Sequence, residues 1–137
     1  MEQYTIGLLN DSFPPSVDGV SNTVVNYAKI IEKDYGHSFV VTPNMAGHDD
    51  SVYPFPVYRY PSINTVKQLG FVTGVPVDFN VRKDIIESKP DLMHVHCPTV
   101  SLILARGLRE TLDCPLVFTY HTKFDVEIQR ILKGKPI

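Results

Sequence analysis

Short apolar runs alternate with segments of helical periodicity along most of the chain, and this alternation restricts the fold more than any other feature. The apolar runs predict strands at residues 4–11, 37–43, 91–98 and 115–120. Apolar side chains recur at helical spacing in residues 21–36, 81–89, 99–114 and 123–136. Strands that alternate with helices predict an α/β fold, with a parallel sheet and helices on both of its faces.

The first predicted helix follows a proline-containing loop that ends the first strand. Ser21 or Asn22 suits its N-cap, and Gly36 suits its end. With the strands on either side, this helix completes a βαβ unit. The middle of the chain is less regular: residues 53–62 predict a short extended piece, and residues 63–80 predict a loop with a helical turn.

The composition argues against several classes of protein. The chain has 137 residues, of which 43% are hydrophobic, and this suits one globular domain. A net charge of -2 and the lack of a dense Lys/Arg run argue against a nucleic-acid partner. The first residues are not typical of a signal peptide, and no stretch reaches the ~18 apolar residues of a membrane span. Cys97 and Cys114 have no metal-binding spacing, which predicts free thiols in a reducing cytosol.

Polar side chains follow three of the predicted strands at the points where these strands end. Asn10 and Asp11 follow the first strand, residues 96–98 end the third, and residues 121–123 follow the fourth. The carboxyl ends of parallel strands lie along one edge, and open α/β sheets bind ligands beyond that edge. We therefore predict that these polar groups share one ligand site.

Gly19 stands just before the first predicted helix. A glycine there permits close approach of the backbone to an anion such as phosphate, although a tight turn without a ligand is the competing interpretation. The sequence has neither the three-glycine dinucleotide fingerprint nor a GxxxxGK[ST] loop. These absences argue against an NAD site and against a P-loop NTPase.

His94 and His96 lie two positions apart on a predicted strand, so their side chains point to the same side. Such a pair can bind zinc in a metal-dependent hydrolase, but no further ligands have convincing spacing. The barrel that houses such pairs needs about 250 residues. We therefore predict no metal site and expect His94 to be hydrogen-bonded within the sheet. Cys97 points away from His96, which argues against a nucleophilic Cys-His pair.

His121 is the strongest single candidate for chemistry. It follows an apolar strand and lies beside Thr119 and Thr122. An imidazole in this position can hydrogen-bond an anionic or sugar ligand, or move a proton near neutral pH. The alternative for His121 is to cap the next helix. Asp11 can accept hydrogen bonds from sugar hydroxyls or satisfy the amides of a loop.

Three motifs in this order resemble the glycosyltransferases of family 4. They are "NDSFPPSVDGV" from Asn10, "KPDLMHVHCP" from Lys89 and "PLVFTYHTKFD" from Pro115. The chain is similar, outside residues 45–80, to the N-terminal domain of retaining GT-B enzymes such as diacylglycerol glucosyltransferases and phosphatidylinositol mannosyltransferases. The resemblance implies a Rossmann-like sheet that belongs to the acceptor side of a two-domain enzyme.

The resemblance also implies roles for individual residues. The glycine-containing loop would lie near the phosphates of the sugar donor, and the histidine after the last strand would lie in the cleft near the transferred sugar. The "H-x-P" turn would line the acceptor side. The predicted substrate-binding residues are Asp11, Asp18, Gly19, Val20, His96, Pro98 and Thr122, with His121 as the catalytic residue.

The implied reaction moves a sugar from an NDP-sugar, of the UDP-glucose or GDP-mannose type, to an acceptor with retention at the anomeric carbon. A lipid such as diacylglycerol is one implied acceptor, no cofactor beyond the donor is expected, and the implied location is the cytoplasm at the inner face of a membrane. Family members are much longer, so residues 1–137 are expected to form a truncated N-terminal domain that lacks the donor-binding domain. We expect the isolated chain to be inactive.

Other functions remain open from the residues alone. An α/β module without enzymatic activity could bind a ligand or partner through the same edge, or self-associate through an exposed strand. A metal-dependent hydrolase would use His94 and His96. A flavodoxin-like domain would bind a nucleotide or a flavin.

Overall fold

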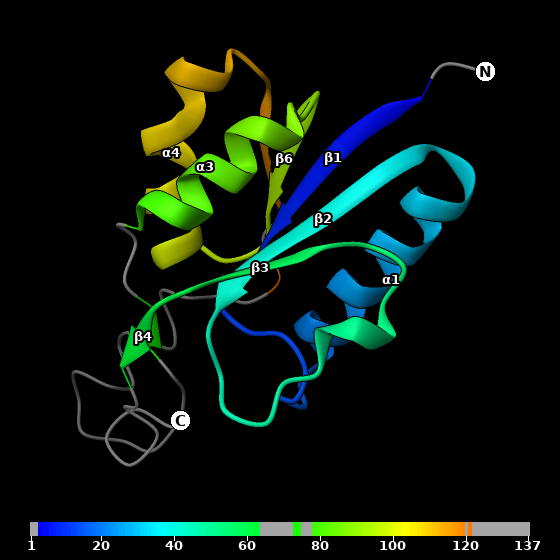
Figure 1. Cartoon of the computed structure of the whole chain (residues 1–137), viewed down its shortest axis with the longest axis vertical. Coiled ribbons are helices and arrows are strands. Elements are labelled where there is room, and N and C mark those ends of the chain that lie inside the picture. Colours follow the sequence, from blue (N-terminus) through cyan, green and yellow to red (C-terminus); the bar gives the residue numbers. More distant parts are fainter. Residues whose placement is uncertain (1–2, 64–72, 75–77, 120, 122–137) are drawn as a thin grey trace.

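The computed structural model describes residues 3–63, 73–74, 78–119 and 121, and it contains a five-stranded parallel sheet (Figure 1). Its order is β3-β2-β1-β6-β7, and every pairing within it is parallel. The strands are β1 (Tyr4–Leu9), β2 (Gly36–Pro43), β3 (Val57–Tyr60), β6 (Leu92–Val95) and β7 (Leu116–Phe118). The sheet confirms the predicted α/β class.

Helices cover both faces of this sheet, as the alternation predicts. Helix α1 (Gly19–Asp34) lies on one face, and α3 (Phe79–Ser88) and α4 (Val100–Leu112) lie on the other (Figure 1). A 3₁₀ turn, η1 (Asp50–Val52), and a small antiparallel pair, β4 (Ser62–Ile63) and β5 (Thr73–Gly74), complete the described elements. In the described part of the chain, no helix is long and apolar enough to cross a membrane.

The hydrophobic core has two parts, one on each face of the sheet, because the side chains of the central strand β1 alternate between the two faces. Leu8 is fully buried against α1, and Leu9 is fully buried on the α3 and α4 side. Each such burial stabilises the fold by about 2 kcal/mol. Leu9 pairs with Val41 of β2 and with Val95 of β6, so the register aligns the carboxyl ends of the three central strands.

The start of α1 differs from the prediction. The N-cap is Asp18, and neither Ser21 nor Asn22, because the Asp18 carboxylate accepts a hydrogen bond of 2.7 Å from the Ser21 amide. Gly36 directly follows the C-cap residue, as predicted. Its φ is +141°, and a Cβ there would lie 2.3 Å from the carbonyl oxygen of Tyr4. Only glycine fits this position without a shift of the backbone.

Several other boundaries also differ. The first strand ends at Leu9 and the third ends at Val95, so the polar residues that follow are loop. The short extended piece predicted at residues 53–62 contains a full strand of the main sheet, β3. Helix α3 starts at Phe79 because Asp78, within the stretch predicted as loop, caps it. The helix predicted at residues 123–136 lies outside the described residues.

Candidate functional site

The order of the strands creates a switch point at the carboxyl ends of β1 and β6. The chain runs from β1 to β2 and β3 on one side, and then continues with β6 and β7 on the other side. Loops that leave β1 and β6 therefore diverge, and ligands of open α/β sheets bind at such a crevice. Asn10 and Asp11 follow β1, and His96 and Cys97 follow β6. The structure thus brings together residues that are more than 80 positions apart, as Asp11 and Ser101 are.

Three histidines form a cluster at this edge. The rings of His94 and His96 are 4.0 Å apart between centroids, so both side chains point to the same side, as predicted, and this is the side of α1. His96 Nδ1 is 2.9 Å from His121 Nε2, and the two rings are stacked at 5.1 Å. Tyr27 of α1 stacks on His94 and contacts the ring of His96. His94 Nε2 forms a 2.5 Å hydrogen bond with Thr119 Oγ1, which gives His94 the partner expected of a histidine in the sheet.

Burial controls the charge of this cluster. Burial, with smaller contributions from its neighbours His94 and His121, lowers the pKa of His96 to about 3. Burial also lowers the pKa of His94, again with a contribution from His121. Both rings are therefore neutral near pH 7. His96 is only 1% exposed, and its Nε2 atom is buried with no hydrogen-bond partner among the described residues.

Asp11 is occupied by helix α4. Its carboxylate accepts hydrogen bonds from the amides of Val100 at 3.1 Å and Ser101 at 2.8 Å, and from the hydroxyls of Thr99 and Ser101. Asp11 thereby supplies the cap that Thr99, the N-cap residue, does not form with its own side chain. These contacts tie β1 to α4: Asp11 satisfies backbone amides, but they belong to the first turn of α4 and not to a loop as expected. A contact with substrate stays a prediction.

Asp18 has a comparable place at the start of α1. It accepts from the amide and hydroxyl of Ser21, both at 2.7 Å, and from the hydroxyl of Ser16 at 3.2 Å. Burial alone would raise the pKa of Asp18, but the hydrogen bonds from Ser21, Ser12 and Ser16 outweigh it and lower the pKa. The carboxylate is therefore ionised. Both α1 and α4 thus begin at this edge with a negatively charged side chain on their N-terminal amides.

The neighbouring candidates vary in how they are placed. Gly19 is exposed as the first residue of α1, and nothing lies within 4 Å of where its Cβ would be. Val20 and Pro98 are partly buried at the same edge, and Thr122 lies outside the described residues. Burial, with Asp11 nearby, raises the pKa of the Cys97 thiol to about 11, which makes it a poor nucleophile.

Arg59 is a functional candidate that the sequence did not indicate. Its guanidinium donates to the Asp50 carboxylate at 2.8 and 2.9 Å and to the carbonyls of Pro14 at 2.7 Å and Pro43 at 2.9 Å. The side chain is 6% exposed. His48 lies 3.2 Å from the same carboxylate. Arg59 thus holds the loop after β1, which contains the predicted donor contacts. A lone arginine in the otherwise apolar "VYRY" was the available signal.

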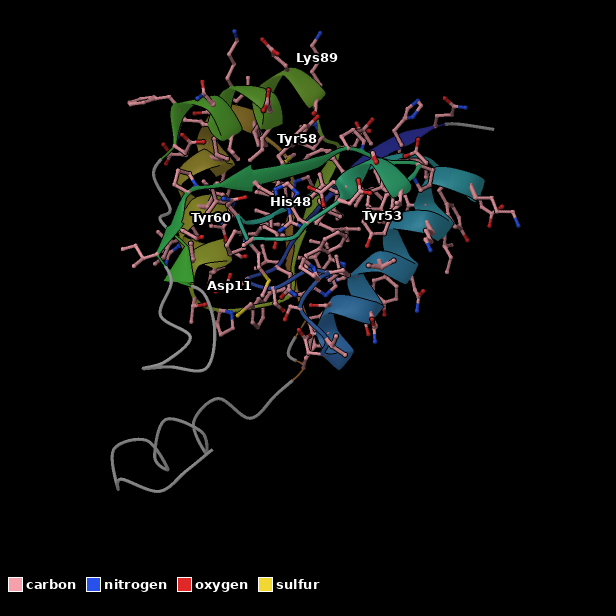
Figure 2. The ribbon with its side chains drawn as sticks, turned by 60° about the horizontal axis from the view of Figure 1, so that its bottom comes forward. Asp11, His48, Tyr53, Tyr58, Tyr60 and Lys89 are labelled. Carbon is pink, nitrogen blue, oxygen red and sulfur yellow. The ribbon has the colours of Figure 1, made fainter. Side chains whose placement is uncertain are left out.

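Tyr60 is another buried polar residue at the same edge. Figure 2 shows Tyr60 and Asp11 at the end of the sheet that borders α4. Burial raises the pKa of Tyr60, and the negative charge of Asp11 raises it further. Tyr60 is therefore neutral and packs as part of the core beside α4.

The described residues contain no group of three or more His, Cys, Asp or Glu side chains that could hold a metal ion. The cluster has three imidazoles, but two of them bond to each other, which uses nitrogens that a metal would need.

Comparison with known proteins relates the chain to glycosyltransferases. A family model described as Glycosyltransferase Family 4 matches residues 17–136. A GDP-mannose-dependent alpha-mannosyltransferase from Corynebacterium glutamicum is 23% identical over 120 residues. The aligned stretch covers 85% of this chain and 29% of the relative, so this chain spans less than a third of that protein's length.

Proposed function

The chain belongs to glycosyltransferase family 4, and we propose that it forms the acceptor-side half of a retaining glycosyltransferase. The observation that carries the proposal is the convergence of family motifs at one switch point, where His96 and His121 are hydrogen-bonded. The relative named above uses GDP-mannose, which supports GDP-mannose over UDP-glucose as the donor.

The proposed reaction exchanges one bond at the anomeric carbon. The bond from this carbon to the donor phosphate breaks, a bond to the acceptor oxygen forms, and the acceptor hydroxyl loses its proton. The nucleoside diphosphate leaves with the electron pair of the broken bond. His121 lies partly buried at the switch point and would hydrogen-bond the reacting sugar or its acceptor. Proton transfer or polarisation by a placed side chain contributes roughly 10²–10⁴-fold in rate.

The residues at the start of α1 have different roles in the loop that is predicted to lie near the donor phosphates. The Asp18 carboxylate is ionised and already accepts a hydrogen bond from the Ser21 amide, so its charge repels a phosphate. We therefore propose that Asp18 holds the shape of the loop and that Gly19 and Val20 supply the approach to the donor phosphates. The open space around Gly19 is consistent with this approach.

The test is an activity screen of the full polypeptide that contains this chain. GDP-mannose and UDP-glucose are offered with lipid and soluble sugar acceptors, and release of nucleoside diphosphate is measured. We expect turnover with one donor, reduced about 100-fold or more in His121→Ala. Exposed His37, at the opposite end of the sheet, supplies the control variant His37→Gln. An enzyme that uses neither donor, or a His121→Ala variant with full activity, would contradict the proposal.

Two further expectations belong to the same proposal. Catalysis needs groups placed from both sides of a cleft, so residues 1–137 alone should show no turnover. A diacylglycerol acceptor and a position at the inner face of a membrane follow only from the resemblance. The screen distinguishes a lipid acceptor from a soluble sugar acceptor, since a glycosylated lipid would extract into organic solvent. Tight binding of a donor or acceptor by the full protein without turnover would favour the alternative of a binding module.

A further inference from the structure

His96 lies behind His121 and is too deeply buried to contact a ligand directly. It is 1% exposed, whereas His121 is partly exposed at the carboxyl edge. The ring of His96 is enclosed by Tyr27 on one side and by the two other histidines. Its one polar contact among the described residues is the 2.9 Å hydrogen bond from Nδ1 to Nε2 of His121. Any effect of His96 on a ligand must therefore pass through His121.

This hydrogen bond has two arrangements when both rings are neutral. In the first, His96 donates from Nδ1, its buried Nε2 keeps only a lone pair, and His121 carries its proton on Nδ1. In the second, His121 donates from Nε2, and His96 carries its proton on the buried Nε2. The second arrangement leaves a buried N–H with no partner among the described residues. Unpaired buried N–H groups are rarer in proteins than unpaired acceptors, so the first arrangement is favoured.

We propose that His96 is a positioning residue that fixes His121 as the Nδ1–H tautomer, so that His121 offers a ligand a hydrogen-bond donor and not a base. The inference rests on the proposed function for the identity of the ligand, but not for the tautomer. The chemical class of the recognised group is an uncharged or anionic oxygen of the sugar or the acceptor. The acceptor proton must then leave to another group, such as a phosphate oxygen of the departing nucleotide.

The surrounding groups support a neutral His96. The ring centroids of His94 and His96 are 4.0 Å apart, so protonation of both rings at once would place two positive charges close together and is unfavourable. Tyr27 presents its ring to both histidines from α1. The neutral ring can therefore act as a donor from Nδ1 while its other nitrogen stays buried without a hydrogen-bond partner among the described residues.

The first test reads the tautomer without any substrate. The ring nitrogens of His121 are measured by ¹⁵N NMR in the full polypeptide at pH 7.5, and they are assigned by comparison with His121→Asn. We expect a protonated Nδ1 and an unprotonated Nε2 on His121. A protonated Nε2 in the unmodified protein overturns the proposal, whether or not any variant folds.

The second test removes the hydrogen bond and keeps the ring. His96→Phe retains the stack but has no donor, so the tautomer of His121 should shift toward Nε2–H. His96→Asn places an amide N–H near the position of Nδ1 and should restore the Nδ1–H tautomer. With GDP-mannose as the probe, kcat should fall roughly tenfold in His96→Phe and recover partly in His96→Asn, with KM nearly unchanged.

The two proposals fail in different ways. A protein that turns over no NDP-sugar but shows the Nδ1–H tautomer contradicts the proposed function and leaves this inference intact. Turnover with a protonated Nε2, or an unchanged tautomer in His96→Phe, contradicts this inference and leaves the proposed function intact.

Discussion

Burial decides what the individual polar side chains at the switch point can do. His96 was predicted to line the acceptor side, but its ring is almost inaccessible and its contact is with His121. Asp11 was predicted to bind substrate, and its two oxygens are bonded to the start of α4. Neither feature is visible in the sequence, because the degree of burial depends on which elements pack above the strand ends.

Burial of His96 also makes the stability of the fold depend on pH. Its pKa falls from 6.5 in an unfolded chain to about 3, so as the pH falls the unfolded state binds a proton before the folded state does. The free energy of unfolding is therefore highest above pH 6.5 and decreases as the pH falls toward 3. We expect His96 to lower the free energy of unfolding by about 2 kcal/mol between pH 7 and pH 5.

This prediction is measured by urea denaturation of the full polypeptide at a series of pH values. His96→Phe removes the titrating ring and should flatten the profile, while His37→Gln, at a largely exposed position, should keep it. A profile that is equally steep in His96→Phe would show that other groups cause the loss.

Among the helices and strands, the sequence predicted the alternation but not the ends. Hydrophobic periodicity placed β1, β2, β6 and α4 within a few residues of their observed ranges. It missed the cap of α1, because Asp18 stands in a loop with several polar residues that could equally serve. It also missed β3 as a strand of the sheet, since four residues between prolines show too short a pattern.

The connection between α1 and β2 leaves no room for a side chain at Gly36. Gly36→Ala should lower the free energy of unfolding by about 3 kcal/mol or more, because its φ is +141° and the new Cβ would meet backbone atoms of Tyr4. Gly107→Ala is the matched control. Gly107 lies inside α4 with nothing within 4 Å of its Cβ position, so this change should stabilise by about 0.5–1 kcal/mol.

Both variants are compared by thermal and urea denaturation. Equal effects of the two substitutions, in sign and size, would contradict this account of Gly36.

Across the described chain, the α/β class was predictable, and the sheet order explains why the strand-end motifs meet. Period and turn residues indicate strands and helices, but they do not say which strands are neighbours. Arg59 shows this limit: its partners Pro14, Pro43 and Asp50 come from separate segments and meet only because β3 lies beside β2. The resemblance to a family predicted which residues form the site, and the structure shows the hydrogen bonds and packing of those that it describes.

The arrangement of the histidines predicts the effect of metal removal. The described residues provide no set of metal ligands, and His96 and His121 already bond to each other. Treatment of the full polypeptide with EDTA, followed by gel filtration, should leave its transferase rate within about twofold of the untreated rate. Stoichiometric zinc that is lost together with activity, and abolished in His94→Ala, would instead support a metal-dependent hydrolase.

The two ends of α1 are attached to the sheet in different ways. At its C-terminal end, one residue, Tyr35, separates the helix from β2, and Gly36 packs directly on the backbone of β1. At its other end, the nine residues from Asn10 to Asp18 join the helix to β1. The short connection at Gly36 therefore leaves almost no freedom in the spacing of α1 and β2, whereas the start of α1 is set by a longer loop and by the hydrogen bonds of Asp18 and Ser21.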